Sequence, residues 1–500
     1  MSIKILQEIS TLVTDFTKKN RFVELIDDGN GGSKYLQLIR GLGEKTWQSD
    51  EEAIQDIYGK PVGFKTFAML KTRAKERLVN LIFQLDTQKR FKSSYDRAYF
   101  LTCKNLLAGA LLLNQNKQNS GLEHLNSALL TSRKYCFTDL SLVSLRLLRA
   151  SSSFSGSKKQ FQNFGNEIKV ALKTLDAELE SEELNQELIL EVVSSVDIKD
   201  KWVAKVKRNY FKLKKLVSEY DTYTTRINMY RVAIRYYNSI YDYRNAIKIA
   251  NDCEKYLNSN RHLIQKVRLG EMNLNKLYGC LHLRDYKNGS EYAKTCMTLF
   301  NPGTVNWLIF LEYYFLLSLH TQNYSQAIEI FTQVINHTGF NRYPPQNREK
   351  WKIFESFLMY ALPDSEKINR KFNISRFLNE VPLYSKDKAG YNLSIIIAQT
   401  ILSLKIGDYD KIIERADALK LYASRYIKKE KNPRSYYFIK MLLVMIQYEF
   451  NPKKTEQIAN KFYIKLKESQ LGMQSELESL EVIPYDLLWP EILKKLSVTH

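Results

Sequence analysis

Apolar residues recur along the chain at steps of three and four positions, which is the spacing of residues on one face of an α-helix. One such set consists of Val203, Val206, Tyr210, Leu213 and Val217. A second set consists of Phe67, Leu70, Ala74, Leu78, Leu81 and Leu85. We find no run of alternating apolar and polar residues bounded by hairpin turns, so the pattern predicts helices rather than strands.

The distribution of proline also favours a helical chain. No proline occurs between Pro61 and Pro302, although a chain with about 5% proline would have about twelve over that distance. Proline is excluded from helix interiors and accepted in loops and edge strands. Its absence therefore predicts successive helices joined by short turns.

A short pattern marks the expected turns. An Asp or Asn is followed by Tyr, then by two further residues and a small or aliphatic one. The Asp or Asn is expected to cap the second helix of a helical hairpin, and the small residue to let two helices approach closely. Four copies span Asp242–Ala246, Asp285–Gly289, Asn323–Ala327 and Asp408–Ile412. Further packing residues are expected at Ala250, Cys253, Ala293, Cys296, Phe331, Val334, Ala416 and Leu419, and a weaker fifth copy at Gly109, Gly121, Leu125 and Ala128.

These columns of small residues resemble the tetratricopeptide repeat, most clearly over residues 225–340 and 390–425. The repeat is degenerate, because its column recurs after 43 residues (246 to 289) and 38 (289 to 327), compared with about 34 in that family. The resemblance implies an all-α fold, a right-handed solenoid of helical hairpins preceded by a small helical N-terminal segment. The other interpretation is an irregular helical bundle whose hairpins share a turn.

The N-terminal segment has a pattern of its own. Ser49–Glu52 is typical of a capping box, and a short helix, a turn at Gly59–Gly63 and a long helix over Phe64–Asp86 follow it. This arrangement resembles a helix-turn-helix, which would place the basic residues of the long helix on phosphates. The alternative is a helix that covers the end of the solenoid and has a solvated basic face. The basic residues are Lys65, Lys71, Arg73, Lys75 and Arg77.

Pattern breaks suggest four parts. We expect a helical N-terminal segment over 1–90, a hairpin solenoid over 91–340, an irregular insertion with several prolines over 341–388, and C-terminal repeats over 389–500. The serine-rich stretch Ser151–Ser157 is a further candidate for a boundary or an exposed loop.

The charge of the chain indicates an acidic partner. Lys and Arg total 75 and Asp and Glu total 54, which gives a formal net charge of +21. One basic stripe lies at helical spacing on the side opposite the apolar set that begins at Val203, so we expect it in solvent, where it either contacts the partner or is simply hydrated. The stripe consists of Lys201, Lys205, Arg208, Lys212 and Lys215.

The sequence shows no motif for catalysis, a cofactor or a metal. The five cysteines are never closer than sixteen residues and the six histidines are scattered, so we expect no metal site and no disulfide framework. The glycine-rich stretch Asp27–Lys34 lacks the spacing of a phosphate loop. The cysteine usage, the absence of a signal peptide and the absence of a long apolar stretch favour a cytoplasmic protein without a membrane segment.

Together these observations predict a non-catalytic scaffold that binds an acidic protein or peptide through a helical solenoid surface. The alternative is a regulator that binds nucleic acid through residues 49–86 and the basic helix 201–215. A third class, an enzyme whose site is assembled from distant repeats, has no motif in its favour. We expect no cofactor, and the sequence leaves the oligomeric state open.

Overall fold

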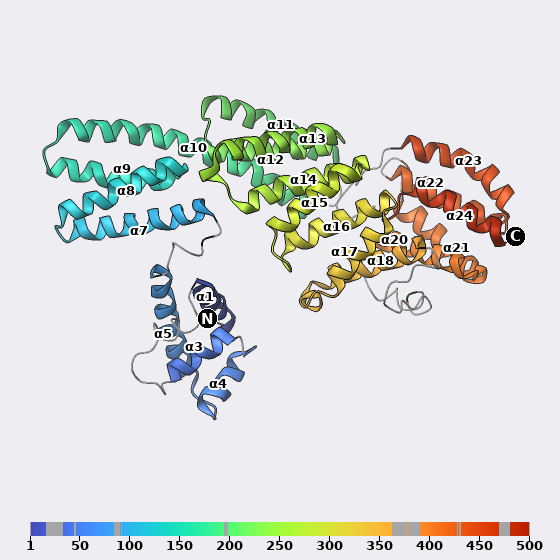
Figure 1. Cartoon of the computed structure of the whole chain (residues 1–500), viewed down its shortest axis with the longest axis horizontal. Helices are drawn as coiled ribbons and strands as arrows, with labels where there is room; N and C mark the ends of the chain where they lie inside the picture. Colours follow the sequence, from blue (N-terminus) through green and yellow to red (C-terminus); the bar gives the residue numbers. More distant parts are fainter. Residues whose placement is uncertain are drawn as a thin grey trace. The chain divides into compact units, whose positions relative to one another are not determined.

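The computed structural model describes residues 2–16, 34–44, 47–84, 91, 93–194, 199–362, 377, 391–427, 429, 432–469 and 481–499. In these ranges every regular element is a helix, which confirms the all-α prediction (Figure 1). The chain divides into two compact units, Met1–Leu175 with His262–Gln265 and Asp176–Arg261 with Lys266–His500. The part boundaries expected near residues 90, 340 and 388 stay predictions.

The first unit begins with four helices that share a core of their own. Helix α1 packs on α3 and α5, and α3 packs on α4. Leu6, Leu38 and Leu78 are completely buried in this core. The helices are α1 (Ile3–Phe16), α3 (Lys34–Glu44), α4 (Asp50–Tyr58) and α5 (Phe64–Phe83).

The predicted turn into α5 is confirmed, with one change in its capping. The Ser49 side chain accepts a hydrogen bond from the Glu52 backbone N–H, and Gly59 ends α4 in the left-handed region at φ 65°. The Glu52 carboxylate, however, accepts from the backbone N–H of Gln48 at 2.6 Å. The capping box therefore closes one residue earlier than the sequence pattern predicts.

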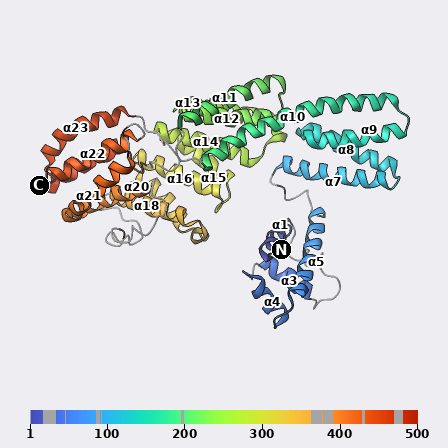
Figure 2. The same ribbon diagram turned by 180° about the vertical axis from the view of Figure 1, so that it is seen from behind.

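The rest of the first unit is a run of helical hairpins. Helices α7 and α8 pack on each other, as do α8 and α9, and α7 also contacts α9. Helix α10 follows α9 and lies beside it (Figure 2); its residues up to 175 belong to the first unit and the rest to the second. These helices are α7 (Ser94–Asn114), α8 (Gln118–Tyr135), α9 (Thr138–Phe154) and α10 (Lys158–Ser194).

The second unit continues the same arrangement, since each helix from α11 to α18 packs on the next, and so does each from α20 to α24. Its main core includes Trp307, Trp351 and Trp489. Its α-helices are α11 (Lys199–Glu219), α12 (Tyr223–Ser239), α13 (Tyr243–Ser259), α14 (Lys266–Leu283), α15 (Tyr286–Leu299), α16 (Val305–His320), α17 (Tyr324–Ile335), α18 (Pro345–Ala361), α20 (Tyr391–Ile406), α21 (Tyr409–Tyr426), α22 (Pro433–Gln447), α23 (Pro452–Glu468) and α24 (Tyr485–Thr499). Two short 3₁₀ helices are η1 (Arg261–Leu263) and η2 (Phe340–Arg342).

The hairpin turns share one backbone geometry. In the turn before α15, Arg284 adopts the left-handed conformation at φ 54°, and the next N–H, that of Asp285, bonds the Cys280 carbonyl at 2.9 Å. This bond reaches back five residues and is the Schellman end of a helix. The same residue, Asp285, then caps the next helix. Equivalent left-handed residues precede α8, α9, α10, α13, α17 and α21: Asn116, Cys136, Gly156, Tyr241, Gln322 and Gly407.

Three of the four predicted caps are confirmed and one is wrong. Asp242, Asp285 and Asp408 each accept a hydrogen bond from the backbone N–H three residues later. Asn323 makes no such bond. Its side-chain amide donates instead to the carbonyl of Thr321 at 3.1 Å and to the Thr321 hydroxyl at 2.8 Å.

The predicted packing columns are confirmed as well, since all of their residues are buried. A Cβ added at Gly289 would lie 2.3 Å from Leu317 Cδ2, which shows how closely the two helices approach. Similarly, a Cβ at Gly109 would lie 2.8 Å from Leu125 Cγ. Adjacent helices thus pack in pairs, as in a helical-repeat solenoid, while the tetratricopeptide family and the hand of the winding stay predictions.

Candidate functional site

The basic helix of the predicted helix-turn-helix is α5, and one of its five cations is not on the surface. Lys71 is 6% exposed. It forms an ion pair with Asp50 at the start of α4, and its ammonium lies 5.0 Å from the centroid of the Phe67 ring. The placement of Lys71 on a solvated basic face was therefore wrong. Its spacing of four from Phe67 and three from Ala74 puts it in the apolar row of the helix.

The other four cations of α5 are exposed; they are Lys65, Arg73, Lys75 and Arg77. They occupy the outer side of the helix, away from the core that contains Phe67, Ala74 and Leu78. Their exposure satisfies the geometric requirement for contacting a polyanion, but it is equally typical of a hydrated helix face.

The predicted basic stripe of α11 faces an acidic partner that belongs to the same chain. Lys205 lies 2.6 Å from Glu191 and 3.2 Å from Glu187, both on α10. Lys212 lies 2.5 Å from Glu180, also on α10. The hydrogen bond to Glu191 raises the pKa of Lys205 above its usual value. Two of the five stripe cations are thus already matched within the fold.

The remaining stripe cations are exposed. Lys215 pairs loosely with Glu219 at 3.9 Å, one helical turn away. Lys201 and Arg208 are exposed on the same helix. The stripe thus lies largely in solvent, but it has acidic neighbours on α10 that the spacing within α11 did not predict.

Charge is divided unevenly along α10. Between residues 176 and 191 the helix has seven acidic residues and no basic one, and this stretch provides the partners of α11. Between 158 and 175 it has four lysines and a single acid, Glu167. Glu167 forms an ion pair with Arg133 of α8. The basic half of α10 therefore has no acid of its own left to balance it.

This basic half and α9 form the two walls of an open groove of about 980 Å³. The chain reverses at Gly156, which has φ 73°, so α9 and α10 run in opposite directions beside each other. Arg149 on α9 accordingly reaches Phe161 on α10, with 5.9 Å between the guanidinium carbon and the ring centroid.

The lining of the groove combines apolar and basic side chains, which we call its apolar floor and its basic rim. Leu142, Ile168 and Leu172 provide apolar surface. The cations are Arg146, Arg149 and Lys169, and the described lining residues include no carboxylate. Nor does any of these cations form an ion pair within the described part of the chain. The amides of Gln162, Asn163 and Asn166 complete the lining.

Gly165 occupies the middle of this lining and differs from the packing glycines of the hairpins. A Cβ added at Gly165 would meet no atom within 4 Å, whereas a Cβ at Gly289 or Gly109 would collide with a neighbouring side chain. Glycine inside a helix costs about 0.5–1 kcal/mol relative to alanine. No close helix contact within the described chain offsets that cost at Gly165.

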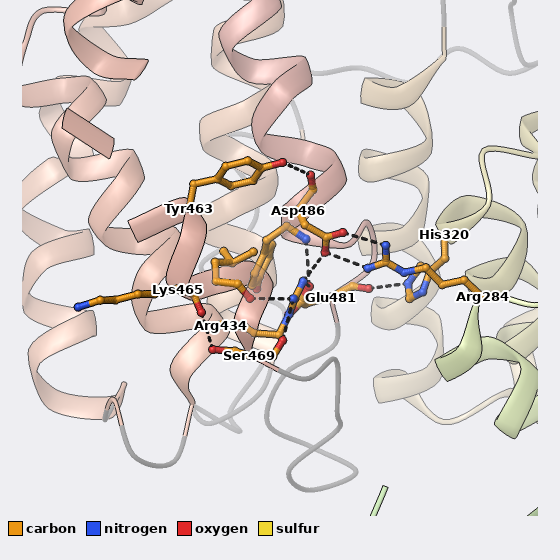
Figure 3. A network of polar contacts seen from close by, with 10 residues as sticks. Arg284, His320, Arg434, Tyr463, Lys465, Ser469, Glu481 and Asp486 are labelled. Atoms are coloured by element: carbon orange, nitrogen blue, oxygen red, sulfur yellow. Dashed lines mark hydrogen bonds and ion pairs between the residues drawn. The ribbon is translucent and has the colours of Figure 1, made fainter. Parts of the chain in front are cut away.

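The largest cluster of ionisable side chains that we identify lies elsewhere, in the second unit, and we call it the Arg434 clamp (Figure 3). Arg434 binds Glu481 with two bonds of 2.6 and 2.8 Å and also bonds Asp486 at 2.5 Å. Arg284 binds both Asp486 oxygens at 2.8 Å. The Nη1 of Arg434 donates to the carbonyls of Leu466 and Ser469, each at 3.2 Å.

The clamp is balanced in charge and its carboxylates are fully engaged. Burial alone would raise the pKa of Asp486, but the hydrogen bonds from Arg284 and Arg434 outweigh burial and lower that pKa to about 2. Glu481 also accepts from the backbone N–H of Tyr485 at 3.0 Å. The oxygens of both acids are therefore taken up by hydrogen bonds, an arrangement suited to holding α22 and α24 together rather than to proton transfer.

His320, at the end of α16, contacts the clamp from inside the core. Its Nε2 lies 2.9 Å from the Glu481 carbonyl oxygen, so Nε2 carries the proton and donates. Burial lowers the pKa of His320 to about 3, although the bond to Glu481 opposes this shift. His320 is consequently neutral at neutral pH. Its Nδ1 has no hydrogen-bond partner among the described residues.

The described ranges contain neither a membrane-spanning helix nor a cluster of metal-binding side chains. No helix there has the length and apolar content needed to cross a membrane. Nor do these ranges bring together three or more His, Cys, Asp or Glu side chains that could hold a metal ion. The glycine-rich stretch Asp27–Lys34 lies outside the described residues except for Lys34.

Comparison of the chain with family models, curated proteins and solved structures gives no match. The candidate sites therefore depend on their geometry alone. Sequence reasoning missed both the groove and the Arg434 clamp. For the groove a signal was present, namely the helical spacing of Leu142, Arg146 and Arg149 on the helix that precedes Gly156.

Proposed function

We propose that the protein is a non-catalytic scaffold that binds an acidic protein or peptide through the surface of its helical hairpins. The observation that supports this is the groove between α9 and α10, whose three cations have no carboxylate partner in the described chain. Exposed cations attract an oppositely charged partner over a distance of about 8–10 Å at physiological salt.

Ion pairs elsewhere in the chain reduce the number of cations that are available to a partner. Lys205 and Lys212 are matched by α10, and Lys71 is matched by Asp50. A partner that bound at those residues would first have to displace an internal carboxylate. The groove cations Arg146, Arg149 and Lys169 have no such competitor, which favours the groove as the place where an acidic partner docks.

The proposal is tested with two labelled polyanions of equal charge, a glutamate-rich peptide and a single-stranded oligonucleotide, by fluorescence anisotropy. We expect the peptide to bind and its affinity to fall with added salt. Reversal of Arg146, Arg149 and Lys169 to glutamate should weaken binding at least about tenfold, a loss of about 1.4 kcal/mol. The matched control, Lys453→Glu with Lys454→Glu on exposed positions of α23, should leave the affinity unchanged.

The competing function, a nucleic-acid-binding regulator, makes a different prediction. Tighter binding of the oligonucleotide, and its loss on reversal of Lys65, Arg73 and Lys75, would favour the helix-turn-helix surface of α5. A peptide that binds neither the protein nor its variants would overturn the scaffold proposal.

A further inference from the structure

We propose that the groove between α9 and α10 holds one amphipathic helix of the acidic partner, with its apolar face on the groove floor and its carboxylates on the basic rim. This inference depends on the proposed function and specifies its ligand.

The lining matches the two faces of such a helix. A helix that docks in a groove buries apolar residues at i, i+3, i+4 and i+7 and keeps its charged residues at the edges. The floor here is apolar through Leu142, Ile168 and Leu172, and cations stand on both walls, Arg146 and Arg149 on α9 and Lys169 on α10. An extended polyglutamate chain would use the cations but would leave the apolar floor in water.

The length of the groove sets the length of the ligand. Its α10 wall runs from Phe161 to Leu172, which at 1.5 Å per residue is about 17 Å, or about three helical turns. Phe161 is 43% exposed at one end and stacks under Arg149. It therefore offers an aromatic surface to the last apolar side chain of the ligand, while the guanidinium stays available to a carboxylate.

Gly165 provides the depth that a helix needs. It lies on the α10 wall and leaves open space where any other residue would place a Cβ. Glycine is the residue that permits the closest approach of a ligand to the backbone. Asn163 and Asn166 beside it are also weak helix formers, so this stretch of α10 gives up intrinsic helix stability at the groove.

Nucleic acid fits these features less well. Binding of single strands uses successive exposed aromatic side chains as stacking platforms along a basic track. The groove has a single lining aromatic residue, Phe161, and its apolar floor of Leu142, Ile168 and Leu172 offers nothing to phosphates. The apolar floor together with the basic rim therefore favours a protein helix.

The test compares Gly165→Leu with Gly165→Ala. Leucine at this position fills the groove, and both substitutions replace glycine by better helix formers at a site where the added Cβ meets nothing. The probe is a fluorescein-labelled peptide of about 18 residues, long enough to form a helix, with Leu at i, i+3, i+4 and i+7 and Glu at most other positions. A second peptide has the same composition with the Leu positions scrambled, and an oligonucleotide of equal charge is the third probe.

We expect the amphipathic peptide to bind at least about tenfold more tightly than the scrambled one. Gly165→Leu should remove that advantage, and Gly165→Ala should retain it. Circular dichroism and thermal melting establish that both variants are folded.

Each other outcome overturns the inference in a distinguishable way. If both peptides bind equally and Gly165→Leu changes neither affinity, the proposed helical ligand and its site in the groove are wrong. The proposal of a scaffold for an acidic partner would still stand. If the folded protein binds neither peptide, the proposed function is contradicted as well. Binding of the oligonucleotide that Gly165→Leu abolishes would assign the groove to nucleic acid.

Discussion

The Arg434 clamp and the groove between α9 and α10 contain similar groups of cations in opposite surroundings. In the clamp, Arg434 and Arg284 are matched by Glu481 and Asp486, and Arg434 is 7% exposed. In the groove, three cations have no carboxylate partner in the described chain, and two of them, Arg146 and Lys169, are exposed. A buried charge must be paired because its desolvation costs several kcal/mol. An exposed charge need not be paired, and so it stays available to a ligand.

Helix α10 repeats this contrast within one element. Its acidic stretch, 176–191, is matched by α11 through Lys205 and Lys212. Its basic stretch, 158–175, has only Glu167, which Arg133 occupies. The comparison teaches that a high net charge does not identify a binding surface. Our proposal instead starts from the charges that the fold leaves unmatched in the described chain.

The largest expected effect is a difference in the free energy of unfolding between a clamp variant and a groove variant. Arg434→Met leaves Glu481 buried without its principal partner and should lower the free energy of unfolding by about 3–5 kcal/mol. Arg146→Met removes an exposed groove charge and should change it by less than about 0.5 kcal/mol. Urea unfolding followed by circular dichroism measures both. Similar losses for the two variants would show that the groove arginine is also structural.

A smaller effect concerns the pH dependence of the clamp region. The pKa of His320 falls from 6.5 to about 3 in the folded protein, so the unfolded chain binds a proton below about pH 6.5 that the folded chain does not. Stability should therefore decrease as the pH falls through this window, by about 2 kcal/mol at about pH 5. Arg284 and His282 lie close enough to disfavour a charged His320, and Asp486 partly offsets them.

His320→Gln is the matched variant, because its amide N–H can still donate to the Glu481 carbonyl while it does not titrate. Its urea midpoint should change less between about pH 7 and pH 5 than that of the unmodified chain. Equal pH dependence in both would mean that other groups dominate acid unfolding.

The smallest effect compares two glycines. Gly289→Ala should destabilise by about 1–3 kcal/mol, because its Cβ would lie 2.3 Å from Leu317 Cδ2. Gly165→Ala should stabilise by about 0.5–1 kcal/mol, because the groove has room and alanine favours the helix. Melting temperatures show whether each substitution lowers or raises the stability of the protein. A loss of stability at Gly165 would show that the groove is closed in solution.

What the sequence predicted was local. The caps at Asp242, Asp285 and Asp408 were predictable because a cap bonds an N–H only three residues away. Asn323 differs because Thr321 offers its amide a nearer acceptor. A further hairpin at Asn451 was missed: its side chain caps α23, but a proline follows it where the other copies have tyrosine.

What the sequence did not predict was pairing between helices. Spacing on α11 shows that its cations share a face, but not that Glu180 and Glu191 of the preceding helix lie against them. The succession of an acidic stretch and a basic helix was a usable signal for that pairing. The clamp had no comparable signal, because Arg284 and Asp486 are 202 positions apart.

The long separation in sequence between Arg284 and Asp486 affects how the second unit unfolds. Repeat proteins commonly fray from their ends, since each repeat contacts only its neighbours. Here Asp486 at the start of α24 is bonded to Arg284 in the turn before α15, and Glu481 is bonded to His320 across 161 positions. These bonds close the intervening helices into a loop without a covalent link. Opening of the last helix must therefore break these bonds as well as its contacts with α23, and we expect its amide protons to exchange with solvent more slowly than those of an unanchored terminal helix.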